Sequence, residues 1–140
     1  MKNLFLTTAL LFYGLFTSVA QNKETVTLTV NISGLNSNDG VLLVGLYNAK
    51  TFFLKKTYKG NIGKINNKKS SVTFVNIPKG EYAVSFVHDK NNNGKMDTNI
   101  LGIPKEDYGC SNNAKGFMGP PKYDDAKFQL QTSKTLEIKI

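Results

Sequence analysis

The chain has 140 residues, of which 18 are basic, 10 acidic and one is histidine, so its formal net charge is +8. Every basic residue is lysine, and the lysines are scattered along the chain. Arginine normally supplies the bidentate contacts to phosphates and bases, so its absence argues against a nucleic-acid partner. The single cysteine, Cys110, cannot form an internal disulfide and is expected to be a small buried hydrophobic residue.

Residues 1–20 have the pattern of a signal peptide. Lys2 precedes an apolar run from Leu4 to Phe16, and small residues at Ser18 and Ala20 place cleavage before Gln21. The apolar run is shorter than the roughly 20 residues that span a bilayer. We therefore expect export to the periplasm or the extracellular space, and no transmembrane segment in the mature chain 21–140. That mature chain has 17 lysines against 10 acidic residues, a formal charge of +7.

Strand-like runs dominate the first half of the mature chain. In "ETVTLTVNIS" (24–33), apolar and polar residues alternate with the period of a half-buried strand. "VLLVGLYNA" (41–49) is more continuously apolar, as in the centre of a sheet. Further strands are expected at 58–65 and at 70–77.

The turn Pro78–Gly80 connects strand 70–77 to a strand over 81–89 and predicts a hairpin. From His88 to Pro121 the composition changes to Asn, Gly, Pro and Lys. Strand patterns return at 126–131 and at 134–140.

No amphipathic helical stripe occurs in the mature chain. Short strands separated by turn signals predict an all-β fold, a single antiparallel β-sandwich of about seven strands, immunoglobulin-like or transthyretin-like, over residues 21–140. The irregular segment 89–125 is long for a connecting loop, and such loops are usually functional. Its apolar residues predict an ordered loop packed on one end of the sandwich.

The stretch "HDKNNNGKMDTN" (88–99) has the spacing of a calcium loop. Calcium takes six to eight oxygen ligands, which a tight loop supplies at alternate positions around a glycine. The expected ligands are Asp89, Asn91, Asn93, the backbone carbonyl of Lys95, and Asp97. Gly94 occupies the position of the sharp turn.

Two features separate this loop from an EF-hand. Ile100 occupies the position of the bidentate glutamate, and strands replace the flanking helices. The shell could be completed by Asn99 or by a carboxylate at 106, 107, 124 or 125. Affinity would then be weak, on the order of 10⁻⁴–10⁻³ M. The alternative is a series of Asx turns, in which the same side chains cap their own backbone amides.

The segment Ile77–Phe128 resembles a family of bacterial exported domains, domain of unknown function 2141. The resemblance rests on Pro-x-Gly-x-Tyr from Pro78, His-Asp-x-Asn-x-Asn-Gly-x-x-Asp from His88, and Gly-x-Pro-x-Glu-x-Tyr-Gly-x-Ser from Gly102. It departs at Cys110, where an aromatic residue is commoner. The resemblance implies a β-sandwich similar to prealbumin-like or carboxypeptidase-regulatory-like domains, and it implies no catalytic activity.

Two functions follow as hypotheses. The first is a non-enzymatic exported binding or structural module, in which a calcium loop pins the long segment and presents Tyr108, Phe117 and Tyr123 to an envelope protein or a carbohydrate. These aromatic residues could instead anchor the segment on the sandwich. The second is a cell-envelope hydrolase using His88 with Asp89 or Glu106. It lacks a nucleophile at a recognisable spacing, since Ser111 is not part of a G-x-S-x-G turn.

Overall fold

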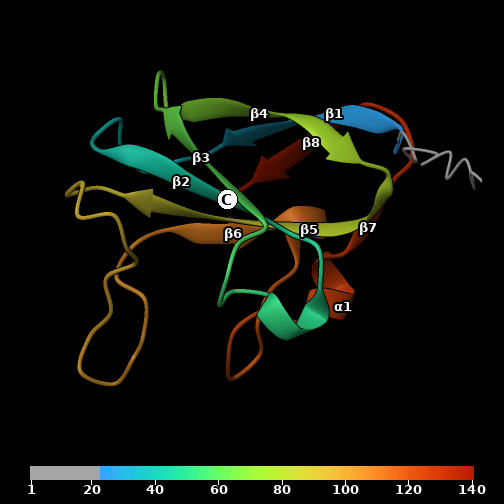
Figure 1. Ribbon diagram of the computed structural model, residues 1–140. Coiled ribbons are helices and arrows are strands. Elements are labelled where there is room, and N and C mark those ends of the chain that lie inside the picture. Colours follow the sequence, from blue (N-terminus) through green and yellow to red (C-terminus); the bar gives the residue numbers. More distant parts are fainter. Residues whose placement is uncertain (1–22) are drawn as a thin grey trace, which may run out of the picture.

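The computed structural model describes residues 23–140 and shows eight strands arranged as two facing sheets (Figure 1). The predicted signal peptide, residues 1–20, lies outside the described residues. The strands are β1 (Thr25–Ser33), β2 (Val41–Tyr47), β3 (Lys59–Lys64), β4 (Lys69–Pro78), β5 (Gly80–Asp89), β6 (Tyr108–Cys110), β7 (Phe128–Leu130) and β8 (Lys134–Lys139). The helical elements are short: the 3₁₀ turns η1 (Lys50–Phe52) and η2 (Ser111–Asn113), and the single α-helical turn α1 (Tyr123–Ala126).

One sheet has the order β4-β1-β8, and the other has the order β3-β2-β5-β6, with β7 also pairing with β5. Alternation in β1 places Leu28, Val30 and Ile32 in the interior, each no more than 1% exposed. They belong to a core that includes β2 and β5 residues such as Leu42, Val84 and Phe86. The all-β sandwich prediction is confirmed, because the alternating apolar positions of both sheets form this one core.

Two details of the topology differ from the prediction. The strand β8 pairs with β1 in parallel, so the sheets are not purely antiparallel. The turn at Pro78–Gly80 does not close a hairpin, because β4 pairs with β1 whereas β5 pairs with β2, β6 and β7. The chain there crosses from one sheet to the other. The Pro and Gly residues determine the bend of the chain at this turn. The sheet that β5 joins is determined by pairing with strands that are distant in sequence.

A second, smaller cluster covers the outer face of β5 near its start. It contains Tyr47, Phe53, Ala83, Cys110, Tyr123 and Ala126. The rings of Tyr47 and Phe53 pack edge-on with their centroids 5.2 Å apart, and those of Phe53 and Tyr123 pack edge-on with their centroids 5.6 Å apart. Cys110 is 1% exposed, as expected for a small buried hydrophobic residue. This cluster attaches η1 and α1, and with them the C-terminal half of the long segment, to the sheet.

Among residues 23–140, no helix has the length and apolar character needed to cross a membrane.

Candidate functional site

The calcium-like loop begins where β5 ends, and its first predicted ligand is buried. Asp89 is 1% exposed. One carboxylate oxygen accepts the backbone N–H of Asn93 at 3.0 Å, and the other accepts that of Gly94 at 2.7 Å. Gly94 has φ +79°, which a glycine adopts without strain. Asp89 therefore folds the loop back over the end of its own strand.

The other predicted ligand side chains converge in the same loop. The side-chain amides of Asn91 and Asn93 donate to the two carboxylate oxygens of Asp97, at 2.7 and 2.8 Å. These bonds, first that from Asn93 and then that from Asn91, lower the pKa of Asp97 below its ordinary value of 3.8. The amide oxygens of Asn91 and Asn93 accept the backbone N–H groups of Asn93 and Lys95. The network is that of the Asx-turn alternative, and the lysine side chain at 95 is exposed.

Glu106 closes the base of the loop. It is 8% exposed, and its two oxygens accept the backbone N–H groups of Lys90 and Asp97, each at 3.0 Å. The N–H of Lys105 donates to the carbonyl of Asp97 at 2.8 Å. Sequence reasoning weighed Glu106 only as a metal ligand or a catalytic carboxylate. Its role as a brace across 16 residues of chain depends on a contact that no local pattern encodes.

Calcium would find two carboxylates among the predicted ligands, Asp89 and Asp97, with amide and carbonyl oxygens around them. Within residues 23–140, no three His, Cys, Asp or Glu side chains gather in a group that could hold a metal ion. Carboxylate, amide and carbonyl oxygens are the ligand types that calcium accepts, whereas transition-metal sites usually include imidazole or thiolate ligands.

His88 is fully buried and positions a neighbouring turn. Its Nε2 lies 2.8 Å from the carbonyl oxygen of Asp39, and because a carbonyl only accepts, Nε2 carries the proton. The Nδ1 atom lies 3.7 Å from a carboxylate oxygen of Asp107 and has no hydrogen-bond partner among residues 23–140. A histidine with 0% exposure cannot reach a polymer outside the protein. This placement argues against His88 as a general base in an envelope hydrolase.

Ser111 is also fully buried and is fixed by the backbone. Its hydroxyl oxygen accepts the N–H of Val84 at 2.9 Å, and the hydroxyl donates to the carbonyl of Ala126 at 2.5 Å. The side chain thus ties β5, η2 and α1 together. A serine in this position joins structural elements and is not available as a nucleophile.

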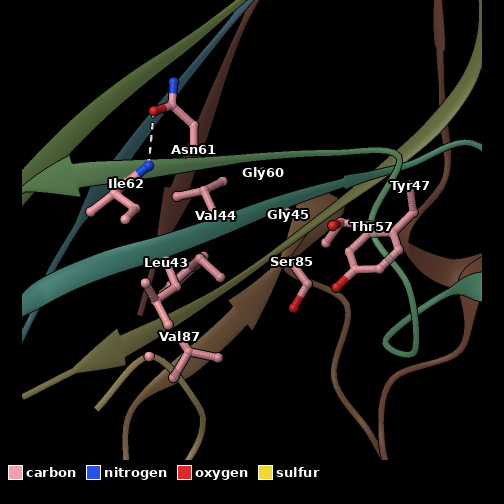
Figure 2. Close-up of a pocket in the computed structure, with 12 residues that line it drawn as sticks. Leu43, Val44, Gly45, Tyr47, Thr57, Gly60, Asn61, Ile62, Ser85 and Val87 are labelled. Carbon is pink, nitrogen blue, oxygen red and sulfur yellow. Dashed lines mark hydrogen bonds between the residues drawn. The ribbon is translucent and has the colours of Figure 1, made fainter. Parts of the chain in front are cut away.

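A groove crosses the outer face of the five-stranded sheet beside the loop (Figure 2), with a volume of about 670 Å³. Cross-strand partners point to the same face, and the register aligns two rows across the strands. One row is apolar and consists of Ile62, Leu43, Val87 and Tyr108. The adjacent row is small and consists of Gly60, Gly45, Ser85 and the buried Cys110.

Tyr47 and Thr57 bound the glycine floor of the groove (Figure 2). A Cβ atom on Gly45 would lie 2.6 Å from the methyl group of Thr57 and 3.0 Å from the hydroxyl of Tyr47. Burial raises the pKa of the Tyr47 phenol, so the ring stays neutral and its hydroxyl can donate. The groove therefore offers an apolar wall opposite hydroxyl groups. Sequence reasoning missed it, because its two rows depend on the pairing of four strands.

The three aromatic residues of the long segment have different environments. Tyr123 is 5% exposed and anchors the segment in the second cluster, whereas Phe117 is 92% exposed. Tyr108 is 38% exposed and ends the apolar row of the groove. The expectation that the loop's apolar residues pack on the sandwich is therefore correct for Tyr123 but wrong for Phe117 and for Ile100, which is fully exposed.

Residues 30–139 match the model of a family described as an uncharacterized protein conserved in bacteria, DUF2141. The chain belongs to this family, as its motifs predicted. No curated protein and no solved structure matches the chain.

Proposed function

We propose that the protein is an exported, non-enzymatic binding module in which a calcium ion held by the Asp89 loop fixes the long segment 89–125 to the sandwich. The observation that supports it is the convergence of Asp89, Asn91, Asn93 and Asp97 within one loop, joined by the hydrogen bonds described above. These are the side chains that the spacing of the sequence identifies as ligands.

Bound calcium would replace hydrogen bonds that the loop makes with itself. The two asparagine amides now direct N–H groups to Asp97, so each would turn its oxygen toward the ion. Asp89 and Asp97 would contribute the carboxylates, and Lys95 its backbone carbonyl. Two carboxylates place the affinity in the weak extracellular class, on the order of 10⁻⁴–10⁻³ M.

A calcium titration followed by thermal unfolding separates this site from a network of Asx turns that needs no ion. Ligand binding to the folded state alone stabilises it by about 1.4 kcal/mol at a tenfold excess over Kd. We expect the Tm to rise by a few degrees in 10 mM calcium, and to rise less in magnesium, which demands stricter geometry. An unchanged Tm would reject the calcium site.

The matched variants are Asp97→Ala, which removes a proposed ligand, and Asp125→Ala. The second removes an exposed carboxylate from α1, which packs near the start of β5 whereas the loop follows its end, so the structure argues against Asp125 as a completing ligand. Calcium should stabilise wild type and the Asp125 variant equally, and it should leave the Asp97 variant unaffected. Equal stabilisation of all three proteins would place the ion outside the loop.

For the partner, we propose a carbohydrate in the groove on the outer sheet face. Sugars present apolar C–H faces edged by hydroxyl groups, and the groove sets Leu43, Val87 and Ile62 opposite the hydroxyls of Tyr47, Thr57 and Ser85. Titration with soluble cell-wall oligosaccharides, followed by NMR, tests this proposal. We expect shifts of the groove resonances in wild type and weaker binding in Ile62→Ser. Shifts confined to other faces would contradict it.

A further inference from the structure

Large apolar side chains are exposed on three separate segments of the chain. These segments are 50–56, 95–105 and 115–122, and we call them together the loop face. Ile100 is 102% exposed, Met118 95%, Phe117 92% and Leu101 78%. With Phe52, Leu54 and Ile103, they make up seven of the twelve exposed large hydrophobic residues of the described chain. Folding has left these groups in water, where each costs free energy.

The three segments project from the same side of the sandwich. In Figure 1 the orange loop between β5 and β6, the red-orange loop between η2 and α1, and the teal-green turn around η1 all extend toward the bottom of the view. The opposite side of the molecule, at the top, is the sheet β4-β1-β8. The segments that carry the exposed apolar residues thus extend from one side of the fold although they are far apart in sequence.

Hydrogen bonds fix the turn that carries Ile100 and Leu101, the tip of the loop between β5 and β6. The side-chain oxygen of Asn99 accepts the N–H of Leu101 at 2.9 Å and that of Ile103 at 3.0 Å. The N–H of Asn99 donates to the carbonyl of Ile103, and a bridge pairs Thr98 with Pro104. This tight turn presents the aliphatic side chains outward and does not let them fold back onto the sheet.

Lysines flank the exposed apolar residues in sequence on all three segments. The seven on the loop face are Lys50, Lys55, Lys56, Lys95, Lys105, Lys115 and Lys122. The same segments contain one acidic residue, Asp97, whose carboxylate accepts hydrogen bonds from two asparagine side-chain amides. Lys50 is paired with Asp124 of the neighbouring α1. Within the described chain, the other six lysines make no ion pair with a carboxylate.

We propose that the loop face docks on a bilayer containing anionic phospholipids, with Ile100, Leu101, Phe117 and Met118 inserted below the headgroups and the lysines among the lipid phosphates. Separate convex tips do not form the continuous, close-packed patch of a protein interface, whereas a fluid bilayer receives each tip independently to a depth of about 5–10 Å. Each lysine near an anionic surface strengthens binding about fivefold. The inference rests on the proposed export in one respect: export decides which membrane the protein meets.

Flotation of the exported protein with vesicles tests the proposal. Vesicles of phosphatidylcholine with one quarter phosphatidylglycerol are compared with pure phosphatidylcholine, in a calcium chelator and at low salt. We expect wild type to float at least tenfold more efficiently with the anionic vesicles, and this binding to fall as salt screens the lysines. Because the chelator removes calcium, failure of the calcium site would leave the result unchanged.

The variants Ile100→Ser/Leu101→Ser and Phe117→Ser/Met118→Ser should each reduce flotation about tenfold or more. Ile62→Ser and Val75→Ser are the matched controls, since both residues are exposed, at 64% and 54%, but lie on strands outside the loop face. Controls that bind as poorly as the tip variants, tip variants that bind like wild type, or equal binding to both vesicle types would each overturn the proposal. Because Ile62→Ser weakens the proposed carbohydrate binding and not flotation, the two proposals fail separately.

Discussion

The carboxylate of Glu106 accepts the backbone N–H of Asp97 at 3.0 Å and, through its other oxygen, the N–H of Lys90 at the same distance. Asp97 and Lys90 lie on opposite sides of the candidate calcium loop. One buried side chain therefore sets the width of the loop at its base. Asp89 acts in the same way inside the loop, on the N–H groups of Asn93 and Gly94. The loop is thus shaped by carboxylate-to-backbone bonds whether or not an ion is present.

Replacing Glu106 by alanine should lower the free energy of unfolding by about 2–4 kcal/mol. Two part-buried backbone N–H groups would lose their acceptor. Each fully buried unsatisfied donor costs about 1–3 kcal/mol, and the partial exposure of these two places their sum in the lower part of the range for two such donors. Glu106→Gln keeps one good acceptor and should cost about half as much. Urea denaturation measures both. Asp125→Ala, at an exposed carboxylate, serves as the control and should change stability by less than about 0.5 kcal/mol. Equal effects at positions 106 and 125 would show that the brace contributes nothing.

Two glycines with positive φ allow a comparison of two costs of adding a side chain. At one glycine the cost is backbone strain alone, and at the other a steric clash is added. Gly94 has φ +79°, and beyond Gly94 itself and its chain neighbours no atom of the described residues lies within 4 Å of the place where its Cβ would be. At Gly40, with φ +70°, a Cβ would lie 1.9 Å from the carbonyl oxygen of Asp89. Gly94→Ala should cost about 1 kcal/mol of stability. Gly40→Ala must displace the start of the loop and should cost roughly 3 kcal/mol or more. Thermal unfolding of both variants checks the order, and a reversed order would contradict it.

The strands could be predicted from sequence because apolar and polar residues alternate along them, and this alternation follows directly from which face of the strand is buried. Leu28, Val30 and Ile32 are apolar since one face of β1 meets the core, and that pattern requires no knowledge of the partner strand. The side chains that converge in the loop could be found for a similar reason, because a tight turn brings residues at positions i, i+2, i+4 and i+8 together. In each case the information lies within about ten residues.

Features that depend on distant pairing could not be predicted in this way. β6 has three residues, too few to show a period, and it exists because Tyr108 and Cys110 pair with Val87 and Ser85. The parallel pairing of β1 with β8 joins the two ends of the domain and has no local signature. The brace at Glu106 and the glycine floor of the groove share this dependence. These features place the loop and the groove next to each other. Several residues of the site could therefore be predicted from the sequence, but their arrangement in space could not.

Acid should weaken the loop through Asp97. Hydrogen bonds from the amides of Asn93 and Asn91 lower the pKa of this carboxyl below 3.8 in the folded protein. A lowered folded-state pKa contributes stability that is present above the unfolded value and is lost as pH falls through the folded one. Asp97→Asn should therefore lose less stability than wild type between pH 5 and about pH 2. Urea unfolding across this range measures the difference, and parallel curves would contradict the assignment.

The thiol of Cys110 should be protected in the folded protein. Burial raises the pKa of this thiol, and the opposing effect of a hydrogen bond with Ser85 is smaller. Alkylation requires the thiolate, and the side chain is 1% exposed within the cluster that contains Tyr123 and Phe53. At pH 8 we expect iodoacetamide to modify the native protein at least about a hundredfold more slowly than the urea-unfolded protein, because modification must await opening of the cluster. Phe53→Ala, which loosens the packing around the thiol, should accelerate native-state modification. Phe117→Ala, at an exposed position in the long segment 89–125 that contains Cys110, should not. Rapid modification of the wild-type protein without denaturant would mean that η1 and α1 separate readily from β5, and it would contradict the attachment of the long segment through this cluster.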